Sequence, residues 1–228
     1  MCGRFTLRAP ASVVAEQFGL FELEPFTPRF NIAPTQPVAA VRLRAEGDPP
    51  QREMVWLHWG LIPSWAKDPK IGARMINARS ETAAERPAFR AAFRRRRCLV
   101  VADGFYEWQR RGGRKQPYFI RMRDDRPLAF AGLWEHWEGP DGTVISSCTL
   151  LTTGPNQLVE PIHNRMPVIL GGEDYGRWLD PAVEQPGPLA SLLRPYPSDA
   201  MIAYPVSTYV NSPTHDDPQC VERVAELF

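Results

Sequence analysis

Residues 98–123, CLVVADGFYEWQRRGGRKQPYFIRMR, decide the fold of this chain. Residues 98–102, 105–109 and 117–123 are short runs rich in apolar and aromatic side chains, which is the pattern of strands rather than of helices. Between the second and third runs, Arg111-Gly112-Gly113-Arg114 has the composition of a tight hairpin turn. The stretch therefore predicts consecutive strands joined by short turns.

Strand-like runs continue on both sides of this stretch, while helical patterns are few and short. We predict further strands at residues 38–43, 53–59, 128–134, 144–152, 168–170 and 201–206. Helices are predicted at residues 11–18, from Pro87 onward, at 174–179 and at 189–193. Because few helices reach crossover length, the pattern predicts an α+β fold with mostly antiparallel, twisted sheets, a barrel-like core and short peripheral helices.

Length and composition predict one domain over residues 1–228. A chain of 228 residues that is 43% hydrophobic can bury one sizeable core, and no linker, repeat or low-complexity tract divides it. No apolar run approaches the roughly 18 residues of a membrane span, and the N-terminus lacks the apolar region of a signal peptide. We expect a cytoplasmic protein without membrane contact.

Cysteine and histidine usage predicts neither disulfides nor a metal. The four cysteines have no CxxC spacing, which in a chain without an export signal favours reduced thiols. The four histidines also lack the spacing of metal ligands. We predict no metal and no cofactor.

Positive charge is concentrated in one part of a chain whose net charge is only +1. Residues 86–126 hold thirteen Arg or Lys against four Asp or Glu, a local charge of +9. This predicts a basic face, which is either a solvated surface or a nucleic-acid site; the run Arg94–Arg97 also suits a helix C-terminus. Aromatic residues accompany the basic ones, a combination that suits unstacked bases better than a duplex: Trp56, Trp59, Trp65, Phe105, Tyr106, Trp108, Tyr118 and Phe119.

The N-terminal sequence Met1-Cys2-Gly3-Arg4-Phe5 offers unusual chemistry once Met1 is removed. Cys2 would then carry a free α-amino group with a usual pKa of about 8 beside a thiol with a usual pKa of about 8.5, so both have a reactive fraction at neutral pH. The pair can act as a nucleophile with its own base, as in N-terminal-nucleophile hydrolases. It can also capture an aldehyde, first as an imine and then as a thiazolidine. The plain alternative is that Cys2 has no role.

Three further polar residues are candidates. Strand alternation places Glu107 on the face of Phe105, where a carboxyl group among aromatics has a raised pKa and can shuttle protons; the alternative is a solvated edge-strand residue. Asn77 lies just before a predicted helix, so its position taken alone indicates a turn or cap residue. His163, in a loop between Pro161 and Pro167, is weak evidence taken alone.

Taken together, seven segments resemble the SRAP family of abasic-site processing proteins, and they span nearly the whole chain. They are CGRF at 2–5, FNIAP at 30–34, WGLIPSW at 59–65, NARSET at 77–82, ADGFYEW at 102–108, HNRMP at 163–167 and PVS at 205–207. The resemblance implies that four catalytic residues converge: Cys2, Asn77, Glu107 and His163.

The same resemblance implies a set of DNA contacts. Arg4 and Arg79 are expected to contact phosphates, Pro34 and Trp65 to form a wedge against bases, and Thr152 to contact the DNA through its backbone. Family members often place a second aromatic after the tryptophan. Here that position is Ala66, so we expect a weaker wedge.

The resemblance also implies the reaction. An abasic site in single-stranded DNA exposes an aldehyde at C1′, which Cys2 would capture as a thiazolidine crosslink that shields the strand. Glu107 would move protons, His163 would assist ring opening of the sugar, and Asn77 would hold the backbone or the amine. A residual imine would give lyase activity, and removal of Met1 would be a self-processing peptidase activity. The expected protein is a monomer that joins the nucleoid when acting on DNA.

Two other classes of function remain open at the level of sequence. A glutamine amidotransferase of the N-terminal-nucleophile type also begins Met-Cys-Gly, and it predicts glutamine hydrolysis without DNA dependence. Such domains need residues that grip the glutamine carboxylate and usually a fused acceptor domain, for which this length leaves no room. The second alternative is a non-covalent single-strand DNA-binding module, in which the basic face is sufficient and Cys2 has no role.

Overall fold

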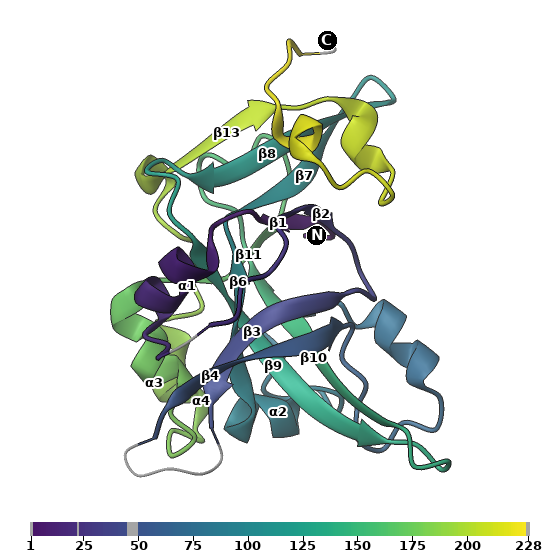
Figure 1. Cartoon of the computed structure of the whole chain (residues 1–228), viewed down its shortest axis with the longest axis vertical. Coiled ribbons are helices and arrows are strands. Elements are labelled where there is room, and N and C mark those ends of the chain that lie inside the picture. The colour runs from purple at the N-terminus through teal and green to yellow at the C-terminus, as the bar shows by residue number, and fades with distance from the viewer. Residues whose placement is uncertain (1, 22, 45–49, 227–228) are drawn as a thin grey trace.

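A closed ring of strands forms the centre of the structure, a computed structural model that describes residues 2–21, 23–44 and 50–226 (Figure 1). The ring consists of β3 (Pro37–Leu43), β4 (Arg52–Trp59), β6 (Arg97–Ala102), β9 (Leu128–Glu138) and β10 (Val144–Thr153). It runs from β10 through β4, β3, β6 and β9 back to β10, and only the β4–β10 pairing is parallel. The predicted barrel-like core is confirmed.

A second sheet lies against one end of the ring and carries the N-terminal strand (Figure 1). It consists of β1 (Phe5–Leu7), β2 (Arg29–Ile32), β7 (Gly104–Arg111), β8 (Arg114–Met122) and β13 (Met201–Pro205), in the spatial order β13-β8-β7-β1-β2. The β7–β8 hairpin turns at Gly112 and Gly113, whose φ angles of 56° and 78° are left-handed. The predicted hairpin is therefore confirmed.

Short strands extend the ring, and short helices surround it. The strands are β5 (Asn77–Arg79) and β11 (Met166–Pro167), both paired with β10, and β12 (Ile169–Leu170), paired with β9. The helices are α1 (Ala11–Phe18), α2 (Arg90–Arg95), α3 (Tyr175–Leu179) and α4 (Pro186–Ala190). Among the described residues, no helix is long and apolar enough to span a membrane.

One predicted helix has the expected bounds, and the others begin at residues other than those predicted. α1 has the predicted bounds because Gly19 ends it in a left-handed conformation, φ 65°. The helix expected from Pro87 is regular only from Arg90 onward, although the Arg90 amide already bonds to the Arg86 carbonyl at 2.9 Å. The helix predicted at 189–193 lies instead at Pro186–Ala190.

Most aromatic residues near the basic segment belong to the core. Trp59, Phe105, Tyr106 and Phe119 are fully buried, and the Trp59 and Phe5 rings pack edge to face with centroids 5.0 Å apart. The prediction that aromatic residues near the basic segment stack on bases is therefore wrong for these four residues. Their hydrophobicity stabilises the junction of the two sheets instead.

Candidate active site

β1 brings Cys2 beside the strand that carries Glu107. Phe5 pairs with Phe105 across β1 and β7, and the Tyr106 amide donates to the Arg4 carbonyl at 3.0 Å. Cys2 is fully buried, with its Sγ atom 3.8 Å from the Arg4 carbonyl oxygen. Burial, reinforced by the negative charge of Glu107, raises the pKa of the Cys2 thiol well above its usual range. The thiol is therefore protonated at neutral pH, contrary to the reactive fraction expected from an unperturbed cysteine.

Asn77 contacts Cys2 directly. β5 lies parallel to β10, with Asn77 opposite Leu150, and this placement aims the amide side chain at the N-terminal segment. Asn77 Nδ2 donates to the Cys2 carbonyl oxygen at 2.7 Å. Within the described part of the chain, the buried Asn77 Oδ1 atom has no hydrogen-bond partner, so it offers an acceptor to a ligand. The expectation of a turn or cap residue was wrong, because pairing with β10 makes this segment a strand.

Glu107 is a buried carboxyl group next to a histidine. It is 2% exposed, and burial raises its pKa to about 7. His163 Nε2 lies 3.9 Å from Glu107 Oε2. His163 Nδ1 lies 3.0 Å from the Arg165 amide nitrogen and 3.2 Å from the Arg165 carbonyl oxygen, so it accepts from the amide in one tautomer of the ring and donates to the carbonyl in the other. Burial also lowers the pKa of His163, so the neutral ring is the form present at pH 7.

A groove leads from Asn77 to the surface. Its volume is about 420 Å³, and it is lined by Trp65, Arg74, Met75, Asn77, Arg79, Thr82, Arg86, Pro87, Ala88 and Phe89. Three of these side chains are arginines and none is acidic. Trp65 is 60% exposed, so its ring is available to a planar ligand. The groove therefore combines a cationic wall with an exposed indole.

The other three predicted DNA contacts do not line this groove. The Arg4 guanidinium donates to Asn31 Oδ1 and to the Val210 carbonyl, both at 2.9 Å, so it anchors the N-terminal strand to the C-terminal segment. Thr152 is buried, and its carbonyl oxygen accepts from the Ser80 amide at 2.9 Å. Pro34 is half-buried in the segment that connects β2 and β3.

The sequence interpretation missed an ion pair that supports the histidine loop. The Arg165 guanidinium donates to both carboxylate oxygens of Glu81, at 2.6 and 2.9 Å, and to the Thr152 carbonyl oxygen at 2.5 Å. Hydrogen bonding to Arg165 also lowers the pKa of Glu81. The signal available in the sequence was the opposite charges of Glu81 and Arg165 in the segments NARSET and HNRMP. Because the two residues are 84 positions apart, the sequence did not indicate that they pair. The pair connects the loop of His163 to the segment that follows β5.

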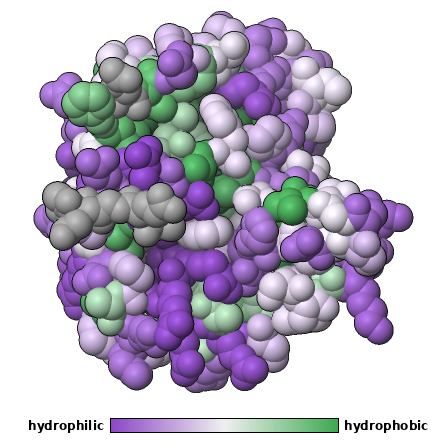
Figure 2. Space-filling model, turned by 60° about the horizontal axis from the view of Figure 1, so that its bottom comes forward, coloured by the Kyte–Doolittle hydropathy of each residue, from purple (hydrophilic) through white to green (hydrophobic). Residues whose placement is uncertain are grey.

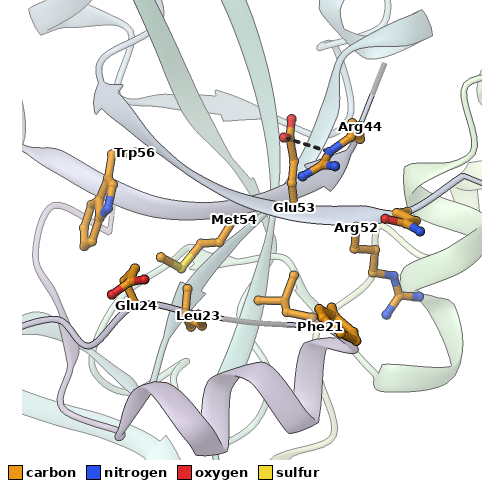
Figure 3. Close-up of a pocket in the computed structure, with 10 residues that line it drawn as sticks. Phe21, Leu23, Glu24, Arg44, Arg52, Glu53, Met54 and Trp56 are labelled. Carbon is orange, nitrogen blue, oxygen red and sulfur yellow. Dashed lines mark ion pairs between the residues drawn. The ribbon is translucent and has the colours of Figure 1, made fainter. Parts of the chain in front are cut away.

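A larger hollow lies elsewhere and contains none of the predicted site residues. Its volume is about 690 Å³, and Figure 3 shows Phe21, Leu23, Met54 and Trp56 around it with an Arg44–Glu53 ion pair at 3.7 Å. The described residues that line it include no thiol, histidine or asparagine. In the described residues, no group of three or more His, Cys, Asp or Glu side chains is arranged to hold a metal ion.

Comparison with known proteins gives a consistent result. The family model described as SOS response associated peptidase (SRAP) matches residues 1–213. The abasic site processing protein YoqW of Bacillus subtilis is 45% identical over 226 residues, which cover 97% of this chain and 99% of that protein. The abasic site processing protein HMCES of Gallus gallus is 36% identical, covering 86% of this chain and 66% of that protein.

A solved structure agrees with these sequence matches. The crystal structure of a protein from Bacteroides thetaiotaomicron superimposes with a TM-score of 0.83 at 27% identity, covering 98% of this chain and all of that one. The family model matches most of the chain, and the 45% identity to YoqW extends over nearly all of it. This chain therefore belongs to the SRAP family.

Proposed function

We propose that this protein captures abasic sites in single-stranded DNA as a thiazolidine crosslink to Cys2, after removal of Met1. Met1 lies outside the described residues. The observation that carries the proposal is the position of residue 2: its carbonyl bonds at 2.7 Å to Asn77, which lines the basic groove, and its thiol is close enough to the buried Glu107 carboxyl group for that charge to raise the thiol pKa. Support also comes from the relatives, which are named for processing abasic sites.

The first step proposed is attack by the α-amine of Cys2 on C1′ of the ring-opened sugar. A new N–C bond forms, the aldehyde oxygen becomes a hydroxyl, and the amine loses a proton. Glu107 relays that proton to the aldehyde oxygen. It then takes the second amine proton and gives it to the hydroxyl, which leaves as water while the C=N bond of the imine forms. A pKa of about 7 suits both transfers, because the carboxyl group is close to half-ionised at neutral pH.

The second step proposed is ring closure by sulfur. The Cys2 thiol adds to the imine carbon, so an S–C bond forms and the thiol proton ends on the ring nitrogen. Burial keeps this thiol protonated, which favours attack by the amine before attack by sulfur. An imine that does not close would permit β-elimination at the sugar, and this is the source proposed for a residual lyase activity.

His163 and Asn77 have supporting roles in this scheme. The neutral His163 ring, whose Nε2 atom lies 3.9 Å from Glu107 Oε2, would donate a proton to the sugar oxygen during ring opening when it is in its Nε2-protonated form. Asn77 holds the Cys2 carbonyl, and its Oδ1 atom is an acceptor for the amine or a sugar hydroxyl. The peptidase activity proposed is removal of Met1 by the same groups, although an aminopeptidase would give the same product.

The groove suits a single strand more than a duplex. A volume of about 420 Å³ with one exposed indole accommodates an unpaired strand whose bases stack on Trp65, while Arg79 and Arg86 face its phosphates. We propose that one protein molecule is sufficient for this binding, because the groove and the buried groups come from one chain.

Mass spectrometry of the protein after mixing with abasic single-stranded DNA tests the proposal. We expect an adduct whose mass is the sum of the two components minus one water. A glutamine amidotransferase would form no such adduct and would instead hydrolyse glutamine without DNA. A non-covalent binding module would retain the DNA under native conditions and release all of it on denaturation, and either result would contradict the proposal.

A further inference from the structure

Three arginines form a ladder that begins in the groove and continues along the following helix. Arg86, Arg90 and Arg94 are spaced by four residues. The Arg90 amide bonds to the Arg86 carbonyl at 2.9 Å, which connects Arg86 to the start of α2. Ala92 and Phe93 of α2 are buried, while all three arginines are exposed. Four residues advance an α-helix by about 6 Å, so Arg90 and Arg94 are about 6 Å apart along the axis of α2.

The neighbouring arginines are used within the fold. Arg95 pairs with Glu184 at 2.8 Å and Arg96 with Glu135 at 2.6 Å. Arg97 is buried and donates to the carbonyls of Phe93 and Trp178, both at 2.6 Å. In the run Arg94–Arg97, the last three arginines therefore bind groups of the protein itself.

The ladder arginines differ from these neighbours. Among the residues that the structure describes, no carboxylate forms an ion pair with Arg86, Arg90 or Arg94. Their charges remain available to a ligand at low desolvation cost, since exposed guanidinium groups bind phosphate without losing an existing partner. Figure 1 places α2 at the lower end of the ring, and the view of that end in Figure 2 is predominantly hydrophilic.

We propose that Arg90 and Arg94 bind the phosphates of the DNA strand that flanks the abasic nucleotide, extending the groove away from the reaction centre. Arg86 lines the groove together with Asn77, and this continuity connects the ladder to the proposed reaction. The inference rests on the proposed function for the presence of DNA in the groove, but it concerns a separate surface.

The test measures equilibrium binding of a tetrahydrofuran abasic analogue, which has no aldehyde and cannot crosslink. The variant is Arg90→Gln/Arg94→Gln, and the control is Arg44→Gln/Arg126→Gln, an equal charge change at exposed residues that line other hollows. One oligonucleotide has a single nucleotide on each side of the lesion. The others carry about eight more nucleotides on one side or the other, either single-stranded or paired to a complement.

We expect the ladder variant to lose affinity only for DNA extended on one side of the lesion. Loss of two single-strand phosphate contacts would lower the slope of log K against log salt by about 1.4 and weaken binding about 25-fold at 0.1 M salt. Comparing oligonucleotides whose extension is single-stranded with those whose extension is paired shows which form of the flanking DNA supplies the phosphates.

Unchanged affinity of the ladder variant would overturn this inference, as would an equal loss with the shortest oligonucleotide or in the control variant. Failure of the wild-type protein to bind any of these DNAs would instead count against the proposed function. Far-ultraviolet circular dichroism of both variants checks that the exposed substitutions leave the fold intact.

Discussion

At the scale of single residues, the Glu107 carboxyl group is the most informative titratable group. Because burial raises its pKa to about 7, its basic form accumulates only as the pH rises through 7. We expect the crosslinking rate of the wild-type protein to rise between pH 6 and 8 and then level off. Glu107→Gln keeps the shape of the side chain but should slow crosslinking by about 10²- to 10⁴-fold and remove this pH dependence. Rapid-quench gels over this pH range measure both effects.

The same carboxyl group predicts a pH-dependent change in stability. Its pKa is about 7 in the folded chain and 4.5 without burial, so between these values the folded state retains a proton that the unfolded state has lost. The contribution to the free energy of unfolding is present below pH 4.5 and is lost as the pH rises through 7. Glu107→Gln should therefore gain stability relative to wild type across that window in urea titrations. A constant difference at all pH values would show that Glu107 is not the buried acid described here.

Asn77 is the second residue with a separable role. Asn77→Leu has a similar volume but removes the hydrogen bond to the Cys2 carbonyl, so it should misplace the nucleophile. We expect crosslinking to slow by about ten- to a hundredfold, because loss of one positioning contact near the reacting atoms has effects of that order. Affinity for the tetrahydrofuran analogue should change little, as fluorescence anisotropy can measure. Equal losses in affinity and rate would mean that Asn77 serves binding alone.

At the scale of elements, the loop of residues 163–167 is positioned by the Glu81–Arg165 ion pair. Glu81→Gln retains one hydrogen-bond acceptor but removes the charge, so the loop should become less ordered around His163. Glu81 is exposed, and we therefore expect a small loss of stability, within about 1 kcal/mol. The crosslinking rate should fall by more than this loss of stability explains, and NMR of the imidazole nitrogens should show a change in the balance between the two tautomers of His163, because both depend on the Arg165 backbone. An unchanged tautomer would contradict this positioning role.

Elements set by local sequence were predictable, whereas those set by distant pairing were not. α1 needed only its apolar spacing and Gly19, both of which are visible in the sequence. β5 is three residues long and exists because it pairs with β10, so Asn77 was taken for a cap. The Arg4 side chain likewise binds groups more than 200 positions away, a contact that no local pattern indicates.

At the scale of the whole molecule, the basic groove and its exposed indole should make binding depend on single-strand character. Trp65→Ala removes the stacking surface, and we expect a loss of about 1 to 3 kcal/mol in binding to single-stranded DNA. The crosslinking rate at saturating DNA should stay near the wild-type value, because Trp65 is exposed at the surface whereas Cys2 and Glu107 are buried. Equal crosslinking to an abasic site inside intact duplex would argue against the groove as the DNA path.

The candidate site was predictable from the sequence only in part. Motif resemblance identified Cys2, Asn77, Glu107 and His163, and the fold supplies the Cys2–Asn77 and Glu107–His163 contacts. Burial could not be judged from one strand, so the raised pKa of the Cys2 thiol emerged only from the packing of both sheets.

Mapping the crosslink on protein with a free or a blocked N-terminus tests the central claim most directly. Protein with Cys2 as its first residue, mixed with abasic single-stranded DNA and digested, should yield one modified peptide that begins at Cys2 and carries the sugar remnant minus one water. Cys2→Ala should give no stable adduct, and an uncleaved extension before Cys2 should give none either. Normal crosslinking by the blocked protein, or an adduct mapped to a lysine, would contradict the account.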